Sequence, residues 1–154
     1  MFLDDVIVPA ENLVGRLNDG WRIANALLGH ERLATSNPQF ALIALERIKT
    51  MARATGVMAD PAFRDRLAAA DINAIVLAAL FSHAVELTNR ERSPGPESSI
   101  LKIYGTELLQ SLNDLLVEAA GSDAAIEHPV MTAFGEVDVS TPFLQVRRAT
   151  IYGG

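Results

Sequence analysis

The chain has 154 residues, of which 49% are apolar and 21% charged, and it contains no cysteine. This length is typical of one domain with its own hydrophobic core. The composition excludes a disordered polymer, a collagen-like repeat, a disulfide scaffold and a cysteine-ligated zinc module. Thirteen basic and nineteen acidic residues give a formal net charge of −6, which disfavours nucleic-acid binding because tracking phosphates requires a basic surface.

The N-terminal residues and the hydropathy bear on where the protein works. Residues 1–5 include two aspartates where a secretory signal would carry lysine or arginine. No uninterrupted apolar run reaches the roughly 18 residues that span a bilayer. We therefore expect a cytoplasmic protein without a membrane span. The mean hydropathy of +0.20 is high for a small free domain, which favours either an oligomer or part of a larger protein.

The first twenty residues of the chain are expected to be extended and then irregular. Residues 2–8 end in β-branched side chains and are stopped by Pro9. Residues 12–20 read as a loop that leads to a helix start, with Asn18 or Asp19 as the N-cap.

A first helical stretch begins at Trp21, since apolar residues then share one helical face, namely Trp21, Ala24, Leu27 and Leu28. Pro38 permits two interpretations: Asn37-Pro38 either starts a second helix or kinks one longer helix. The residues that follow keep an apolar stripe, with their charged side chains expected toward water. The stripe is Phe40, Ile43, Ala44 and Ile48, and the charged residues are Glu46, Arg47 and Lys49. Gly56 ends this stretch.

The next helix is predicted from Pro61 to about Arg90, with Asp60 before it as a cap. Residues 72–81 are apolar nearly all round, which is typical of a helix inside a bundle. His83 lies on this helix, where a buried structural histidine is the favoured interpretation. Residues 93–96, Ser-Pro-Gly-Pro, break the helix.

A further long helix follows, with one apolar side made of Ile100, Tyr104, Leu108, Leu112 and Leu115 or Leu116. Residues 121–138 lack periodicity and are read as a functional or site-covering loop. Thr141-Pro142 then caps a last short helix that runs through Arg147 and Arg148. Long antiparallel helices with short breaks predict an all-α, up-and-down four-helix bundle that is preceded by a short extended N-terminal segment.

The sequence contains few motifs that indicate a catalytic or metal-binding site. The chain has no Gly-x-Ser-x-Gly, no phosphate loop and no dinucleotide fingerprint, which excludes conventional hydrolases and nucleotide triphosphatases. Its three histidines, His30, His83 and His128, do not form the Glu-x-x-His pairs of di-iron bundles. No metal site is predicted.

Two local features remain as candidates for a catalytic or ligand-binding site. If the first helix continues past Gly29, Glu31 lies on its apolar stripe, where partial desolvation would suit a general base. Alternatively, Glu31 and Arg32 form a solvated pair or part of a cap. In the C-terminal tail, Arg147 and Arg148 could hold an anion beside two glycines that permit close backbone approach, or the tail is a frayed C-cap.

Four segments of the chain, in the same order, share patterns with one known family. They are residues 2–15, residues 20–32 with Gly20-Trp21 and Leu28-Gly-His-Glu-Arg32, residues 99–109, and residues 148–154 with the sequence Arg-Ala-Thr-Ile-Tyr-Gly-Gly. Together they resemble the acyl-CoA dehydrogenase family. The resemblance is to the strand and loop that leave its middle β-domain, the opening of its C-terminal helical domain, a later helix, and the active-site turn.

The resemblance implies a division of the chain and a reaction. Residues 1–18 would be the end of the middle β-domain and a linker, and residues 19–154 the C-terminal helical bundle domain. In the family, a glutamate removes the α-proton of an acyl-CoA thioester while the β-hydrogen leaves as hydride to FAD. The product is a trans-2-enoyl-CoA, in fatty acid or sterol side-chain β-oxidation, and the electrons pass to an electron-transfer flavoprotein. Without the other domains we expect this chain to be inactive alone.

The resemblance also implies site residues. Some members carry the base in the active-site turn, where this chain has Gly153, and others carry it on the first helix of the domain, where this chain has Glu31. Glu31 is therefore the expected catalytic base. Substrate contacts are expected from Arg32, Tyr152 and Gly153, and FAD contacts from Glu118, Gly121 and Gly154.

Two departures from the family pattern fall on flavin contacts made across a subunit interface. The family's Arg-x-x-x-Phe-Gly has no phenylalanine around residues 49–56, and its Gln-x-x-Gly-Gly is here Glu118-Ala-Ala-Gly-Ser122. The alternative is a non-catalytic helical bundle that serves in oligomerisation or as the partner subunit of a heteromeric acyl-CoA dehydrogenase. We expect a homo- or hetero-oligomer in either case.

Overall fold

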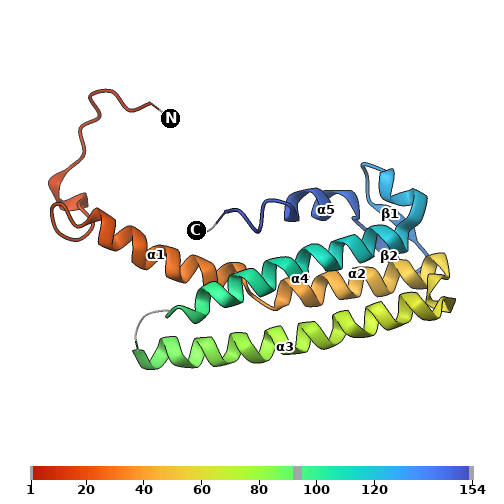
Figure 1. Cartoon of the computed structure of the whole chain (residues 1–154). Coiled ribbons are helices and arrows are strands. Elements are labelled where there is room, and N and C mark those ends of the chain that lie inside the picture. The colour runs from red at the N-terminus through yellow and green to blue at the C-terminus, as the bar shows by residue number, and fades with distance from the viewer. Residues whose placement is uncertain (1, 92–94, 153–154) are drawn as a thin grey trace.

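The computed structural model describes residues 2–91 and 95–152 (Figure 1). Its five α-helices are α1 (Gly20–Thr35), α2 (Gln39–Thr55), α3 (Pro61–Glu91), α4 (Glu97–Ala120) and α5 (Ser140–Val146). A two-stranded sheet is formed by β1 (Val130–Thr132) and β2 (Gly135–Val137), and single 3-10 turns occupy Ala10–Asn12, Val57–Ala59 and Gly121–Ala125.

The helices α2, α3 and α4 lie side by side and run in alternating directions (Figure 1). Helix α4 is central, because it contacts α1, α2, α3 and α5. Helix α1 leads into α2 and projects beyond the bundle toward its N-terminus, and α5 returns along α4 (Figure 1). The predicted all-α, up-and-down bundle is confirmed.

Local side-chain chemistry accounts for where the helices begin and end. The Asn37 side-chain oxygen accepts the backbone N–H of Gln39 at 2.9 Å, so Pro38 separates two helices and does not kink one. Gly56 ends α2 with a φ of 79°, a conformation that favours glycine. The Asp60 carboxylate accepts the N–H of Ala62 at 3.0 Å at the start of α3, as expected.

The start of α1 differs from the expected cap. Asp19 occupies the N-cap position, but its carboxylate forms no side-chain cap bond; it accepts instead from the Arg22 guanidinium at 2.8 Å. The other candidate, Asn18, has a φ of 67° and lies one residue before the N-cap position. An ion pair on the outer face of the first turn therefore replaces backbone capping.

The hydrophobic core lies between α2, α3 and α4. Its fully buried members include Ile48 and Met51 from α2, Phe63 and Leu77 from α3, and Leu112 and Leu116 from α4. The predicted apolar side of α4 is buried from Leu108 to Leu116, whereas Ile100 at its start is exposed.

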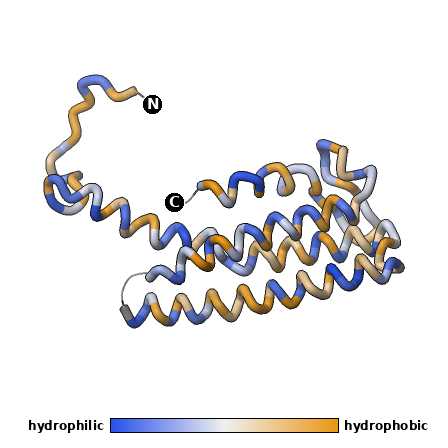
Figure 2. Tube along the Cα trace, in the orientation of Figure 1, coloured by the Kyte–Doolittle hydropathy of each residue, from blue (hydrophilic) through white to orange (hydrophobic). Residues whose placement is uncertain are grey.

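The middle of α3 is not enclosed, so the prediction that residues 72–81 lie inside the bundle is wrong for this chain. One face packs into the core through Ala74 and Leu77, but Ile72 is 60% exposed and Ile75 69% exposed, with Val76 and Leu80 beside them. Figure 2 shows hydrophobic residues along the middle of α3. The reason is geometric: α2 and α4 cover only one side of this helix. We call the stripe of Ile72, Ile75, Val76 and Leu80 the outer face of α3.

The apolar character of α3 also bears on membranes. Pro61–Arg90 contains an 18-residue window of mean hydropathy 1.6, so by length and composition alone this one helix could cross a bilayer. The expectation of no membrane span was based on the absence of an uninterrupted run of apolar residues. The mean hydropathy of an 18-residue window is a less strict criterion, because it tolerates polar residues within the window. One such helix is weak support for a span, and the inner face of α3 belongs to the bundle core.

Other expectations about exposure also fail within this chain. Trp21 and Leu27 on α1 are exposed, since the N-terminal half of α1 projects beyond the bundle. His83 is exposed on α3 and is not a buried structural histidine. Residues 2–9 form no strand and run away from the bundle (Figure 1).

The segment predicted as a loop over residues 121–138 contains a 3-10 turn and a short hairpin. Strands β1 and β2 pair antiparallel, with Val130 opposite Val137. Strands of three residues are too short to show periodicity in the sequence. The final helix begins at Ser140 and ends at Val146, so Thr141-Pro142 is inside it, while Arg147 and Arg148 lie in the turns that follow.

Candidate functional site

A cavity of about 480 Å³ lies where the end of α1, the beginning of α2, the middle of α4 and the C-terminal turn meet. Its apolar wall includes Phe40 and Ile43 from α2, Leu109 from α4, and Pro142 and Val146 from α5. A volume of this size is within the range of small-molecule sites. Three separate parts of the chain, residues 34–47, 106–113 and 142–152, thus line one space, which we call the α1–α5 cavity.

Two buried polar side chains of α4, Thr106 and Asn113, line this cavity. Asn113 is only 3% exposed and donates its amide to the Leu109 carbonyl at 2.8 Å. The buried Thr106 hydroxyl donates to the Lys102 carbonyl at 2.7 Å. Because the backbone of α4 already accepts these two donors, neither leaves an unsatisfied donor in the core.

Two guanidinium groups line the same cavity: Arg47 from α2 and Arg148 from the C-terminal turn. None of the described residues that line it is aspartate or glutamate. Arg148 lies over the Tyr152 ring at 5.8 Å from its centroid, which is cation–π range. Sequence reasoning placed Arg47 toward water, but it is half-buried. The spacing could have indicated this position. Arg47 follows Ile43 by four residues and Ala44 by three, so it lies on the same helical face as these two residues of the apolar stripe.

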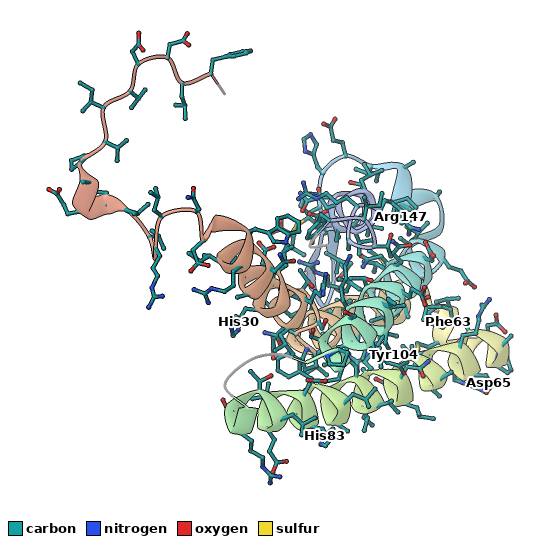
Figure 3. All side chains as sticks on the ribbon, turned by 60° about the vertical axis from the view of Figure 1, so that its left-hand side comes forward. His30, Phe63, Asp65, His83, Tyr104 and Arg147 are labelled. Atoms are coloured by element: carbon teal, nitrogen blue, oxygen red, sulfur yellow. The ribbon has the colours of Figure 1, made fainter. Side chains whose placement is uncertain are left out.

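The other arginine of the tail has a structural role. Arg147 forms an ion pair with Asp114 of α4, and its guanidinium lies 4.3 Å from the Phe143 ring centroid (labelled Arg147 in Figure 3). The expectation that the two adjacent arginines act together on an anion is therefore corrected. Arg147 holds the C-terminal turn, residues 147–152, against α4 through its ion pair with Asp114, whereas Arg148 lines the cavity.

Glu31, the expected base, lies on α1 one helical turn before Ala34 and Thr35, which line the cavity. Its side chain is exposed, so the expected partial desolvation does not occur within this chain. The helix does continue past Gly29, as that expectation required.

Arg32 is half-buried and joins α1 to α4. Its guanidinium Nη1 donates to the Ser99 hydroxyl at 3.3 Å, and its backbone carbonyl accepts the Ser36 hydroxyl at 2.6 Å. The alternative in which Glu31 and Arg32 form a solvated pair is not what the structure shows, because Arg32 is engaged with α4.

Tyr152 lies in the wall of the α1–α5 cavity and is 49% exposed. It therefore shares one cavity with the last turn of α1, which follows Glu31. Gly153 and Gly154, expected at the substrate and the FAD, lie outside the described residues.

The remaining expected flavin contacts lie elsewhere. Glu118 follows Ser99 by nineteen residues, about 28 Å along α4 at roughly 1.5 Å per residue. It forms an ion pair with Arg66 in a separate groove of about 510 Å³ between α3 and α4. Gly121 has a φ of 56° and open space around the position of a Cβ. The structure therefore does not bring Glu118 and Gly121 to the side of Glu31 and Tyr152.

The α3–α4 groove does not fit the pyrophosphate of FAD by itself. Glu107, Asp114 and Glu118 all line it, against one arginine, Arg66. Three carboxylates repel a dianionic pyrophosphate, although a carboxylate can accept hydrogen bonds from ribose hydroxyls or an adenine amine. The described residues that line this groove thus lack the donors that a pyrophosphate requires.

Metal ligands do not converge in the part of the chain that the structure describes, where no group of three or more His, Cys, Asp or Glu side chains could hold an ion. His30 and His83 lie on the outside of α1 and α3 (Figure 3).

Comparison with known proteins identifies the family of this fold. The profile described as "Acyl-CoA dehydrogenase, C-terminal domain" matches residues 18–154. Similar proteins from Mycobacterium tuberculosis include "Acyl-CoA dehydrogenase FadE34", 32% identical over the whole chain and 20% of its own length, and "Acyl-CoA dehydrogenase IpdE1", 31% identical over the whole chain and 39% of its own length. "Acyl-CoA dehydrogenase FadE26" of the same organism is 28% identical over 81% of the chain and 34% of its own length.

The chain thus spans between one fifth and two fifths of the length of these relatives. No solved structure matches it at a comparable level of significance. The profile match covers every helix of the bundle, from the residues before α1 to the C-terminal turn. The chain therefore belongs to the family of acyl-CoA dehydrogenase C-terminal domains.

Proposed function

We propose that this domain serves a FAD-dependent acyl-CoA dehydrogenase that converts an acyl-CoA thioester to its trans-2-enoyl-CoA. The observation that carries the proposal is the position of Glu31, one turn before Ala34 and Thr35, which line the same cavity as Tyr152. The family match supports the reaction class.

In this reaction the α-carbon loses a proton and the β-carbon loses hydrogen with its electron pair, so a C=C bond forms. In this proposal Glu31 accepts the α-proton on its carboxylate, since it lies one turn from the cavity and no described residue that lines the cavity is aspartate or glutamate. Glu31 is exposed here. Substrate and the other domains would exclude water from it, which strengthens a carboxylate as a base.

Arg32 and Tyr152 position the substrate in this proposal. The contact of Arg32 with Ser99 fixes the last turns of α1 against α4, which sets the direction of the neighbouring Glu31 side chain. Tyr152 is held from the other side, since its backbone N–H donates to the Arg148 carbonyl at 3.1 Å.

FAD would supply the hydride acceptor, and an electron-transfer flavoprotein would take the electrons onward. Glu118 and Gly121 lie away from Glu31 on this chain, so we assign them, by the family resemblance, to uncharged parts of the FAD of a neighbouring subunit. The donors for its pyrophosphate would have to come from other domains or another subunit.

The test is Glu31→Gln in a protein that joins this domain to the other two domains of the family. Turnover of acyl-CoA should fall by roughly 10² or more because the base is lost, while bound FAD, measured by its visible absorbance, should remain. Glu46→Gln on α2 is the matched control and should leave turnover within about twofold. Retained turnover in Glu31→Gln would assign the base elsewhere.

The outer face of α3 favours a second candidate, a non-catalytic helical subunit that serves in assembly. Four large apolar side chains on one exposed stripe are typical of an interface. Ile75→Glu should then abolish concentration-dependent association in analytical ultracentrifugation while the helical circular dichroism stays unchanged. A wild-type chain that remains monomeric at every concentration would remove the support for this candidate.

A further inference from the structure

The connection between α1 and α2, residues 36–38, is partly buried, and we call it the α1–α2 joint. Ser36 is 1% exposed, whereas Asn37 beside it is exposed. Connections normally lie on the surface, because their backbone polar groups need water or another partner. A buried residue at this place therefore indicates that the α1–α2 joint packs against another element.

That element is α4, and the contact is at Gly105. A Cβ at this position would lie 3.3 Å from the Ser36 Cα, which is closer than carbon atoms usually approach. It would also lie 3.5 Å from the Leu77 Cδ1, so α3 borders the same position. The Ser36 Cα belongs to the backbone and has no other rotamer to adopt. The distance between the joint and α4 thus depends on the absence of a side chain at residue 105.

Hydrogen bonds make the end of α1 and the joint one unit. The Ser36 hydroxyl donates to the Arg32 carbonyl at 2.6 Å, and the Thr35 hydroxyl donates to the same oxygen at 3.0 Å. The Ser36 backbone N–H donates to the Leu33 carbonyl at 3.1 Å. A displacement of Ser36 is therefore transmitted to Arg32 and to Glu31, which directly precedes it.

Two contacts with α4 fix where this unit lies. One is Gly105 at the joint, and the other is Ser99, whose hydroxyl accepts from the Arg32 guanidinium at 3.3 Å. These two positions are about 9 Å apart along α4, at roughly 1.5 Å per residue. Glu31 precedes Ser36 by about 7.5 Å along α1 on the same measure. Movement at Gly105 would therefore change the position and the direction of the helical turn that carries Glu31.

We propose that Gly105 is a positioning residue for the base. The inference rests on the proposed function, in which the Glu31 carboxylate accepts the α-proton. A methyl group at residue 105 would move the joint away from α4 by a few tenths of an ångström. A misplacement of about 1 Å can lower a rate by roughly 10², so this smaller shift should lower kcat by about threefold to tenfold.

The experiment compares Gly105→Ala with the wild type in the protein that joins this domain to the other two domains. The value of kcat should fall by about threefold to tenfold while KM stays within about twofold, because substrate binding does not use Gly105. With a substrate that carries deuterium at the α-carbon, the isotope effect on kcat should rise, since a misplaced base makes proton removal more strongly rate-limiting. Bound FAD, measured by its visible absorbance, should be unchanged.

Two further variants separate positioning from stability. Ile48→Val removes one methyl group from the core, outside the joint, and is matched to Gly105→Ala in its expected loss of stability. It should leave kcat, KM and the isotope effect unchanged. Ser36→Ala adds no bulk and removes one of the two hydroxyls on the Arg32 carbonyl, so it should lower kcat by about twofold to fivefold and raise the isotope effect.

Movement of the turn is also measured without turnover. In the 154-residue chain, the backbone amide NMR signals of residues 29–31 should shift in Gly105→Ala and stay in place in Ile48→Val. These residues do not touch Gly105 by the contacts described above, so a shift there reports displacement of the end of α1.

The proposal is overturned if Gly105→Ala and Ser36→Ala both keep the wild-type kcat and isotope effect, or if the amide signals of residues 29–31 stay in place. If Gly105→Ala does not fold, Ser36→Ala decides between these outcomes. Glu31→Gln is measured beside them. When it loses turnover and the other two variants do not, the base stands and only its positioning falls. An active Glu31→Gln enzyme overturns the assignment of the base, and the role of Gly105 with it.

Discussion

The side-chain amide of Gln110 on α4 donates to the Thr150 hydroxyl at 3.2 Å and lies 3.4 Å from the Val146 carbonyl. These contacts, with the Arg147–Asp114 ion pair, fasten the C-terminal turn to the middle of α4. The turn carries Arg148 and Tyr152, so one glutamine and one ion pair place both residues in the α1–α5 cavity.

Gln110→Ala should loosen this turn without unfolding the bundle. Loss of a partly buried hydrogen bond of this kind is worth about 0.5–1.5 kcal/mol, so amide exchange at Ile151 and Tyr152 should accelerate by roughly threefold to tenfold. Hydrogen–deuterium exchange measures it. Ser111→Ala is the control, because the Ser111 hydroxyl bonds the Glu107 carbonyl within α4 and does not touch the turn. Equal exchange in both variants would show that Gln110 does not hold the turn.

Gly105 permits the close approach of α1 and α4. A Cβ at this position would lie 3.3 Å from the Ser36 Cα and 3.5 Å from the Leu77 Cδ1. Gly105→Ala gains up to about 1 kcal/mol of helix propensity but costs about 1–3 kcal/mol of overpacking against backbone that cannot give way. We expect a net loss of about 1 kcal/mol in the free energy of unfolding, measured with urea.

The matched control for Gly105 is Gly20→Ala in the first turn of α1. No atom lies within 4 Å of its would-be Cβ, so this change should be neutral or slightly stabilising. A stabilising Gly105→Ala would mean that α1 and α4 are farther apart in solution than in the structure.

Ile48 and Ile72 provide a test of inner and outer apolar positions. Ile48 is 0% exposed in the core, and Ile48→Ala should lower the free energy of unfolding by about 2–5 kcal/mol through lost burial and a cavity. Ile72 is on the outer face of α3, so Ile72→Ala should change the free energy of unfolding by no more than about 0.5 kcal/mol. A large cost at Ile72, measured in the same urea titration, would show that a partner covers the outer face of α3.

Asp19 and Arg22 predict a local pH effect. The hydrogen bond from Arg22 holds the pKa of the Asp19 carboxyl below its ordinary value of 3.8. The folded state thus prefers the ionised form. This small contribution to stability is present above pH 3.8 and is lost as the pH falls through the folded pKa.

NMR titration of the Asp19 carboxyl carbon would measure this shift. Arg22→Gln should return the pKa to its ordinary range, and Arg16→Gln, on the preceding loop, should leave it low. A pKa of Asp19 that is the same with and without Arg22 would contradict the pairing.

Several predictions could be made from local sequence because local interactions decide them. The break at Pro38, the end of α2 at Gly56 and the start of α3 after Asp60 each depend on a proline, a left-handed glycine or a side-chain cap within a few residues. The hairpin at residues 130–137 was missed, since three-residue strands carry no periodic signal.

The candidate site could be predicted only in part. Four ordered segments identified the family, and with it the roles proposed for Glu31, Arg32 and Tyr152. That Arg47 faces a cavity and that Arg147 serves the fold while Arg148 faces the cavity depend on contacts between α2, α4 and the C-terminal turn. No spacing along the chain determines which of two adjacent arginines turns inward.

Helix positions, helix breaks and the family could be predicted from the sequence, because propensity, capping and motif order are properties of neighbouring residues. Which apolar faces are covered by another element depends on the packing of the whole chain. Residues 72–81 are apolar nearly all round, yet α2 and α4 cover one side of α3 and leave its outer face exposed. Burial depends on the number and placement of neighbouring elements, and no single helix encodes these.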